Sequence, residues 1–363
     1  MKIQEILNKS IQLEQISFDE SLFLYKKASL SDLMFAANEI RKKLHPNNTV
    51  TWLIDRNVNI TNGCVTQCKF CNFHRKINSD EVYITTIDDY KQKIDELLKL
   101  GGEQLLLQGG MHPKLGIEFY ENLFSELKHL YPNVKLHSLG PPEVFFLAKK
   151  AKISVAETLQ RLMKSGLDSL PGAGAEILVD RVRQFVSKAK CSADEWLDVM
   201  REAHKLNLPT SATMMFGHYE TLEERIEHLM KIRQVQNEKP ENSYGFLSFI
   251  SWPFQDKGTS LSNDFGITNQ ISASDYIRFV ALSRIVLTNF QNIQASWLTV
   301  GASVGQICLQ AGANDFGSIM IEENVVSSAG AEFSLDENGM KKAISDAGFI
   351  PKKRNQKFEI IEK

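Results

Sequence analysis

The 363-residue sequence lacks any long apolar run, and it contains only five cysteines. A membrane-spanning helix needs roughly 20 consecutive apolar residues, so we expect no transmembrane segment. The first five residues, MKIQE, are interrupted by polar side chains and lack the apolar core of a secretory signal. Together these absences predict a soluble, cytoplasmic protein.

The chain also lacks an excess of either charge. Lysine and arginine number 42 against 44 aspartates and glutamates, which gives a net charge of -2. Such a balance provides no general attraction to nucleic acid or to an anionic membrane surface, so we expect neither as a partner. Apolar residues make up 43% of the chain, enough for a sizeable core in one large α/β domain or two smaller ones.

The few cysteines are unevenly distributed. Cys64, Cys68 and Cys71 follow one another at the spacing C-x3-C-x2-C, whereas Cys191 and Cys308 are isolated. An odd number with three clustered does not resemble a disulfide framework and favours a reducing compartment. We expect the two isolated cysteines to be small buried apolar residues and predict no second iron–sulfur site.

The clustered cysteines indicate a metal centre, because thiolates this close can converge on one. A [4Fe–4S] cluster held by three cysteines leaves its fourth iron open, whereas clusters that only carry electrons usually have four protein ligands. The motif therefore predicts a cluster that binds a substrate or cofactor. The competing interpretation is a zinc site completed by His74. We favour the cluster, since structural zinc usually stabilises small domains.

Short apolar runs alternate with amphipathic helical segments after about residue 50. Eight such βα units predict a parallel (β/α)8 barrel of the TIM type, with a six-stranded partial barrel as the alternative. We expect a helical N-terminal extension at residues 1–48, the barrel at 49–338, and a tail at 339–363 that packs on or near the barrel. The predicted strands are Trp52–Ile60, Gln104–Gln108, Val134–Ser138, Leu167–Leu170, Thr210–Phe216, Phe246–Trp252, Ile293–Leu298 and Asp315–Ile321.

Polar residues alternate along the first and the seventh of these strands. Side chains two apart share a face of a strand, which in a barrel can point into the lumen. We predict that this face binds substrate; the alternative is that its amides and hydroxyls satisfy loop backbone. The residues concerned are Asp55, Asn57, Asn59, Gln294 and Ser296.

The cysteine motif, with Phe70 before its last cysteine and its place after the first strand, resembles the radical S-adenosylmethionine superfamily. The resemblance implies that the amino and carboxylate groups of S-adenosylmethionine chelate the open iron. It implies that one electron cleaves the sulfonium, and that a 5′-deoxyadenosyl radical then abstracts hydrogen from a small-molecule substrate. Flavodoxin or ferredoxin is the implied electron donor. Phe70 would cover the cluster or stack on the adenine.

The same resemblance assigns cofactor-binding roles to residues at strand ends. Gln108, Gly109 and Gly110 stand where the superfamily has a Gly-Gly-Glu element that holds the methionine amino group. No glutamate follows here, so backbone carbonyls are the expected contact. Glu176 would hydrogen-bond the ribose, and Ser138, at the end of the third predicted strand, completes the predicted cofactor site.

Further segments resemble the branch of the superfamily that serves menaquinone and deazaflavin biosynthesis. Within that branch the resemblance, over about residues 50–355, is strongest to the group that cyclises dehypoxanthine futalosine. It implies hydrogen abstraction at C4′ of the ribose, attack on the benzoate ring, and loss of an electron and a proton. The alternatives are aminofutalosine or deazaflavin-forming enzymes and, outside catalysis, an iron–sulfur or zinc sensor. The most diagnostic segments are Asp55–Asn59, Trp252–Gln255 and Glu322–Val326.

The implied reaction needs a base for the final proton. The candidates are acidic or histidine residues near the ends of predicted strands, of which His218 and Asp315 are best placed. The others are Glu220, Glu322 and Glu323.

The implied reaction also needs a cation for the benzoate carboxylate, and the sequence singles out none. Arg56 would face away from the polar face of its strand, and Arg284 lies on a predicted helix, where we expect a surface charge. The basic run Lys352, Lys353 and Arg354 in the tail is expected to be solvated.

Overall fold

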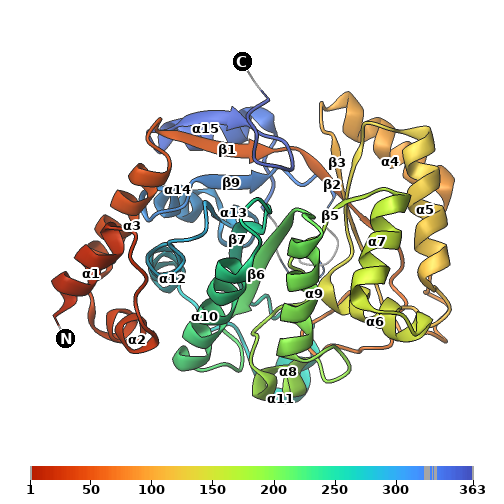
Figure 1. Ribbon diagram of the computed structural model, residues 1–363, viewed down its shortest axis with the longest axis horizontal. Coiled ribbons are helices and arrows are strands. Elements are labelled where there is room, and N and C mark those ends of the chain that lie inside the picture. Colours follow the sequence, from red (N-terminus) through yellow and green to blue (C-terminus); the bar gives the residue numbers. More distant parts are fainter. Residues whose placement is uncertain (1, 323–327, 329, 331–332, 362–363) are drawn as a thin grey trace.

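Parallel strands alternate with helices along the chain, and the helices lie outside the strands (Figure 1). The structure is a computed structural model that describes residues 2–322, 328, 330 and 333–361. The strands are β1 (Thr49–Leu53), β2 (Asp55–Asn59), β3 (Gln104–Gln108), β4 (Lys135–Ser138), β5 (Leu167–Ser169), β6 (Thr210–Phe216), β7 (Phe246–Pro253), β8 (Asn292–Gln294), β9 (Asp315–Ser318) and β10 (Ile350–Lys353).

The first strand joins two sheets into a ring. Their orders are β10-β1-β9-β8-β7-β6 and β2-β3-β4-β5, and β2 continues β1 after Ile54. At the other seam a single parallel bridge links Leu170 to Thr210. If β1 and β2 are counted as one strand and β10 is left out, eight strand positions enclose the lumen. The predicted α/β fold of the TIM type is thus confirmed, with one seam only weakly bridged.

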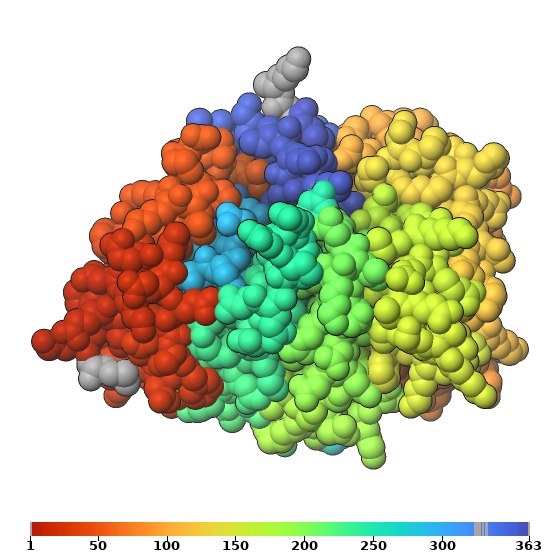
Figure 2. Space-filling model, in the orientation of Figure 1, coloured from red at the N-terminus to blue at the C-terminus, as the bar shows by residue number. Residues whose placement is uncertain are grey.

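Helices cover the outside of the strands, and their apolar stripes form the core. Three helices precede the barrel, and they lie at one end of the molecule (Figures 1 and 2). The helices are α1 (Ile3–Ile11), α2 (Phe18–Lys27), α3 (Leu30–Leu44), α4 (Ile87–Lys99), α5 (Ile117–Leu130), α6 (Pro141–Ala151), α7 (Val155–Ser165), α8 (Asp180–Val186), α9 (Ala193–Lys205), α10 (Leu222–Glu238), α11 (Ser260–Phe265), α12 (Ala273–Val286), α13 (Trp297–Val300), α14 (Ala302–Gln310) and α15 (Glu337–Asp346). No helix among the described residues is long and apolar enough to cross a membrane.

The N-terminal helices are attached to the barrel helices by buried polar contacts as well as apolar packing. Arg225 of α10 donates to the hydroxyl of Tyr25 at 2.9 Å, and Arg278 of α12 donates to the carbonyl of Ala28 at 2.8 Å. Leu24, Leu33 and other apolar residues of these helices belong to the main core. The helices thereby extend the barrel's core on one side.

Several sequence predictions are wrong in detail. The seventh strand was expected over Ile293–Leu298, but β8 ends at Gln294 and the chain turns into α13. The amide of Ser296 donates to the hydroxyl of Tyr276 at 2.9 Å instead of extending the ladder. Arg284 is fully buried, not at the surface, because its guanidinium binds the carbonyls of Gly312 and Phe290.

The third correction concerns the basic run of the tail. Arg354 is buried, because β10 pairs with β1 and carries the end of the chain to the base of the barrel. Lys353 donates to the carbonyl of Gly101 at 2.5 Å, so this side chain is also engaged. Figure 2 shows the C-terminal segment, in blue, lying against the rest of the molecule.

The buried histidines predict a loss of stability in mild acid. Burial lowers the pKa of His204 and that of His228 to about 3, so both remain neutral in the folded protein while the unfolded chain takes up protons below its ordinary pKa of about 6.5. From pH 6.5 to pH 5 each histidine should therefore remove about 2 kcal/mol of stability. His204→Gln keeps a polar group beside the Thr210 hydroxyl, which now lies 2.9 Å from the ring nitrogen.

The measurement is the thermal unfolding midpoint from pH 7 to pH 5, in parent and H204Q proteins. The parent should lose more stability than the variant over this interval. Carboxyl groups whose pKa is raised by burial act in the opposite direction, but they are common to both proteins and cancel in the comparison. Identical pH profiles would contradict the assignment of a neutral buried His204.

Candidate active site

The lumen of the barrel holds a cavity of about 440 Å³. One end is formed by the cysteine loop that follows β2, and the other by the tail that follows β10. Between them the wall is made by residues of the strands and by Ser296, which follows β8. They include Asp55, Asn59, Gln104, His137, Ser169, Thr213, Ile250, Gln294, Ser296 and Ser318.

The three clustered cysteines all line this cavity. The Thr66 hydroxyl lies 3.0 Å from the sulfur of Cys64 and 3.4 Å from that of Cys68, and the amide of Met111 donates to the sulfur of Cys64 at 3.3 Å. Donors directed at sulfur are the groups that tune a cluster held by thiolates. The donor set therefore fits three corners of an iron–sulfur cluster at the mouth of the lumen.

The zinc alternative gains no support from the geometry. Within the part of the chain that the structure describes, no three His, Cys, Asp or Glu side chains are arranged to hold one metal ion. The ring of His74 lies 3.0 Å from the carbonyl of Cys71, so this histidine contacts the loop backbone rather than joining the sulfurs. In a four-iron cluster each thiolate binds a different iron, so the three sulfurs lie further apart than the ligands of a single metal ion.

Gly109 and Gly110 bring the end of β3 against the cysteine loop. The amide of Gly110 donates to the carbonyl of Thr61 at 2.7 Å. A Cβ at Gly110 would lie 2.2 Å from the carbonyl oxygen of Gly63 and 2.9 Å from the Cβ of Cys64. Both contacts are far inside van der Waals distance, and the first is with backbone. The close approach therefore requires glycine and holds the first cysteine in place.

Gly110→Ala is expected to impair cluster loading, because the added methyl must push the Cys64 backbone outward. Gly116→Ala is the matched control, since the nearest atom to its Cβ is the flexible end of Glu118 at 3.0 Å. We expect iron bound per chain after anaerobic reconstitution to fall at least several-fold in G110A and to stay unchanged in G116A. Full loading of G110A would contradict a role of this glycine in shaping the cysteine loop.

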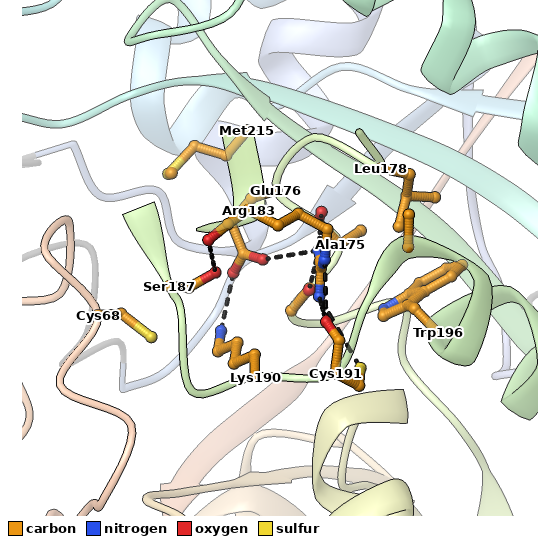
Figure 3. A network of polar contacts seen from close by, with 12 residues as sticks. Cys68, Ala175, Glu176, Leu178, Arg183, Ser187, Lys190, Cys191, Trp196 and Met215 are labelled. Atoms are coloured by element: carbon orange, nitrogen blue, oxygen red, sulfur yellow. Dashed lines mark hydrogen bonds and ion pairs between the residues drawn. The ribbon is translucent and has the colours of Figure 1, made fainter. Parts of the chain in front are cut away.

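Glu176 lies on the opposite side of the cluster end and forms an ion pair with Lys190 at 2.9 Å (Figure 3). Arg183 fixes the same loop through the carbonyls of Ala175, at 2.7 Å, and Cys191, at 3.0 Å. In Figure 3 the thiol of Cys68 points toward Lys190. Burial alone would lower the pKa of Lys190, but Cys68 and Glu176 together raise it. This ammonium therefore stays charged beside the cluster site.

The aromatic ring predicted to cover the cofactor also lies here. Phe70 lines the cavity, and the Lys190 ammonium sits 5.2 Å from the centroid of its ring. Of the other predicted cofactor-binding residues, Gln108, Gly109 and Glu176 line the cavity as well. Ser138 is elsewhere, fully buried, with its hydroxyl donating to the carbonyl of Leu107 at 3.1 Å. Its predicted contact with the cofactor does not fit the geometry.

The predicted substrate-binding face is largely brought together. Asp55, Asn59, Gln294 and Ser296 line the cavity, whereas Asn57 is buried and does not line it. Burial raises the pKa of the Asp55 carboxyl, against the opposing effect of the Ser318 hydroxyl that donates to it.

His218 and Asp315, the two preferred bases, do not line the cavity. The side chain of His218 is buried, with Nε2 3.1 Å from the carbonyl of Met215 and Nδ1 3.4 Å from Glu220. Asp315 is fully buried and accepts hydrogen bonds from Arg354 at 2.6 and 3.0 Å and from Thr51 at 2.5 Å. In both cases the side chain is buried and bound to neighbouring protein groups rather than facing the cavity. The prediction that His218 or Asp315 is the base therefore does not fit the structure.

Two of the other candidate bases, Glu220 and Glu322, do not line the cavity either. Glu220 is paired with Arg225 at 2.8 Å, and Glu322 with Arg56 at 2.9 Å. Glu323 lies outside the described residues.

The sequence reasoning missed two groups that line the cavity. One is the tail, whose Arg354, Gln356 and Phe358 form the base of the lumen. Gln356 donates to the hydroxyl of Ser169, and the guanidinium of Arg354 lies 3.7 Å from the centroid of the Phe358 ring. No local pattern in the tail marks these residues as lumen-facing, because their position depends on the pairing of β10 with β1.

The second missed group is Glu143, in the first turn of α6. Burial raises its pKa to about 8, although Lys190 and the amides of Gly140 and Gly109 oppose the shift. Its Oε1 is buried and has no hydrogen-bond partner among the residues described. The sequence did offer one indication of this role. Glu143 follows two prolines in the short segment after the end of β4, and a barrel gathers its functional residues at strand ends.

Comparisons with known proteins agree with this arrangement. Residues 58–232 match the Radical SAM superfamily, and residues 243–363 match the CofH/MqnC C-terminal region. The chain is 40% identical to cyclic dehypoxanthine futalosine synthase of Halalkalibacterium halodurans, covering 99% of this chain and 95% of that protein. It is 34% identical to aminodeoxyfutalosine synthase of Thermus thermophilus, covering 98% and 95%.

A third relative and a solved structure extend the comparison. The 5-amino-6-(D-ribitylamino)uracil–L-tyrosine 4-hydroxyphenyl transferase of Archaeoglobus fulgidus is 36% identical, covering 90% of this chain and 92% of that protein. The crystal structure of methylornithine synthase aligns with a TM-score of 0.73 at 18% identity, covering 95% and 97%. Because the sequence identity is only 18%, this structural match supports the fold and not the activity.

The barrel and the cysteine loop at its mouth define an enzyme of the radical S-adenosylmethionine class. The chain belongs to the radical SAM superfamily and, within it, to the group of futalosine-pathway and deazaflavin-related enzymes that these relatives represent. The resemblance found in the sequence is confirmed. The superfamily in general uses a [4Fe–4S] cluster and S-adenosylmethionine, so the sensor alternative is set aside.

Proposed function

We propose that the protein cyclises dehypoxanthine futalosine to cyclic dehypoxanthine futalosine on the futalosine route to menaquinone. The observation that carries the proposal is the 40% and 39% identity, over nearly the whole chain, to two proteins with that activity in their names. The lumen is compatible with it, because the cysteine loop lines it at one end and Arg354 and Gln356 of the tail line it at the other. An intramolecular ring closure needs such an enclosed space more than it needs many catalytic groups.

The cofactor proposed is a [4Fe–4S] cluster with S-adenosylmethionine, which together supply a 5′-deoxyadenosyl radical for hydrogen abstraction. Cys64, Cys68 and Cys71 would hold the cluster. Glu176 would accept a hydrogen bond from the ribose, and the Lys190 ammonium would face the methionine carboxylate. Phe70 would pack over the adenine side. These roles follow the positions of the side chains around the cluster end of the lumen.

Polar residues on the remaining wall of the lumen would hold the substrate. Asp55 and Gln104 are joined by a 3.2 Å hydrogen bond, and Asn59, Gln294 and Ser296 project into the same space. Their amides, hydroxyl and carboxyl offer hydrogen bonds to sugar hydroxyls without a bulky quencher of the radical. A cofactor and substrate that fill this space would displace water, which would otherwise intercept a reactive intermediate. A low-potential protein such as flavodoxin or ferredoxin is the proposed electron donor.

A panel of acceptors tests the choice of substrate. Reconstituted, reduced protein is given S-adenosylmethionine with dehypoxanthine futalosine, with the aminodeoxyfutalosine synthase substrate, or with the deazaflavin precursor and tyrosine. We expect deoxyadenosine together with a cyclised product only from the first. A coupled product from either of the others would reassign the enzyme within its family, and no deoxyadenosine from a fully loaded cluster would contradict the proposal as a whole.

A further inference from the structure

The cluster end of the lumen lacks one acidic group at the place where β3 approaches the cysteine loop. Gly109 and Gly110 are followed by Met111, so the strand end supplies backbone but no carboxylate. The amide of Met111 is already used by the sulfur of Cys64. An amine bound at the open iron beside this loop would present N–H donors that need acceptors.

A carboxylate reaches the same place from the neighbouring strand. β4 pairs with β3, and two residues separate the end of β4 from the start of α6, which has Glu143 in its first turn. Glu143 lines the cavity together with Gly109 and Gly110.

The environment of Glu143 is unusual for a glutamate in the first turn of a helix. Glu157 holds the equivalent third position of α7, where it is exposed and only supports the helix start. Glu143 instead lines the cavity, and its buried Oε1 has no hydrogen-bond partner among the described residues. A buried carboxyl oxygen without a donor is costly, so its place in the sequence is explained most simply by a bound ligand that donates to it.

We infer that Glu143 is the residue that accepts a hydrogen bond from the amino group of bound S-adenosylmethionine, replacing a carboxylate that the β3 end does not supply. The bond aligns the amine for chelation of the open iron and links the cofactor to the α6 side of the lumen. The inference rests on the proposed cofactor but not on the proposed substrate.

The other role for a carboxyl in this cavity is acceptance of the final proton from the substrate ring. The position of Glu143 argues against it, because its carboxyl lies within hydrogen-bond reach of the Gly109 amide, and Gly109 and Gly110 pack on Thr61, Gly63 and Cys64 of the cysteine loop. The two roles differ in what they affect. A contact with the cofactor changes binding in the absence of substrate, whereas a proton acceptor changes only turnover.

The test is binding of S-adenosylmethionine to the reconstituted holoenzyme without substrate, for the parent, Glu143→Gln and Glu157→Gln. Equilibrium dialysis gives the affinity, and the electron paramagnetic resonance spectrum of the reduced cluster reports whether the cofactor chelates iron. Loss of a charge-assisted hydrogen bond should weaken binding about 10-fold or more in E143Q, with a smaller spectral change on adding cofactor. E157Q should match the parent in both.

A second ligand makes the test specific to the amine. An S-adenosylmethionine analogue with hydrogen in place of the amino group should bind weakly, and equally weakly, to parent and E143Q. Parental affinity of E143Q for S-adenosylmethionine would overturn the inference, even if product formation were lost. Failure of E143Q to load iron would also overturn it, because Glu143 would then be a structural residue. Neither outcome bears on which substrate is cyclised.

Discussion

Replacing Cys68 with alanine is expected to abolish activity, with deoxyadenosine formation falling at least 1,000-fold, a loss of about 4 kcal/mol or more in transition-state stabilisation. Cys68 lies at the centre of the motif, buried between the Thr66 hydroxyl and the region of Lys190. Two thiolates cannot hold three irons of a cluster, so the variant should also lose the cluster. The measurements are iron and sulfide per chain and deoxyadenosine by mass spectrometry.

Cys308→Ala is the control for this prediction. Cys308 is fully buried in α14, far from the motif in sequence, and its removal takes only a small group from the core. We expect parental iron content and turnover in C308A, with stability lower by about 1 kcal/mol. A C68A protein that still bound iron and cleaved S-adenosylmethionine would refute the cysteine loop as the cluster site. Equal losses of iron and of turnover in both variants would indicate that the substitutions impair folding rather than the cluster site.

Removal of the Arg354 charge opposite Asp315 is expected to be the most destabilising single change. Arg354 binds both carboxylate oxygens of Asp315, and both residues are buried. Arg354→Met leaves the carboxylate with the Thr51 hydroxyl and the Gly317 amide as donors and without a counter-charge. Breaking such a pair costs about 3–5 kcal/mol, which for a chain of this size lowers the unfolding midpoint by about 4–7 °C.

The double variant distinguishes a paired charge from simple loss of packing. Asp315→Asn together with Arg354→Met should recover much of the stability lost in R354M, because no unpaired ion remains. Additive losses would contradict the ion-pair account. The single variant D315N also tests the role first assigned to this residue: an enzyme of parental stability but with product formation blocked would restore Asp315 as the base.

The sequence predicted those features that depend on local spacing. The cysteine motif needs only three positions in one loop, and the period of two along Asp55, Asn57 and Asn59 follows from strand geometry. Even there the prediction was incomplete, because Asn57 is covered by its surroundings. Position on a strand face gives the direction of a side chain but not what lies over it.

The features that were missed depend on contacts between distant parts of the chain. Arg354 was expected in solvent because its neighbours are lysines, yet pairing of β10 with β1 places it beneath the lumen beside Asp315. Arg284 was likewise assigned to the surface from its helix alone. A buried arginine needs several carbonyl or carboxylate partners, and those partners come from other segments. Glu143 was missed for the same reason, because its place beside the cavity depends on the pairing of β4 with β3.

The most direct test of the central claim follows one hydrogen atom. Dehypoxanthine futalosine that carries deuterium at C4′ of the ribose is incubated anaerobically with the reconstituted, reduced enzyme and S-adenosylmethionine. The masses of the deoxyadenosine and of the cyclic product are then measured by mass spectrometry. The account predicts deuterium in the deoxyadenosine and a cyclic product that has lost that deuterium and one further hydrogen. Deoxyadenosine without deuterium, or a product that retains the label at C4′, would contradict it.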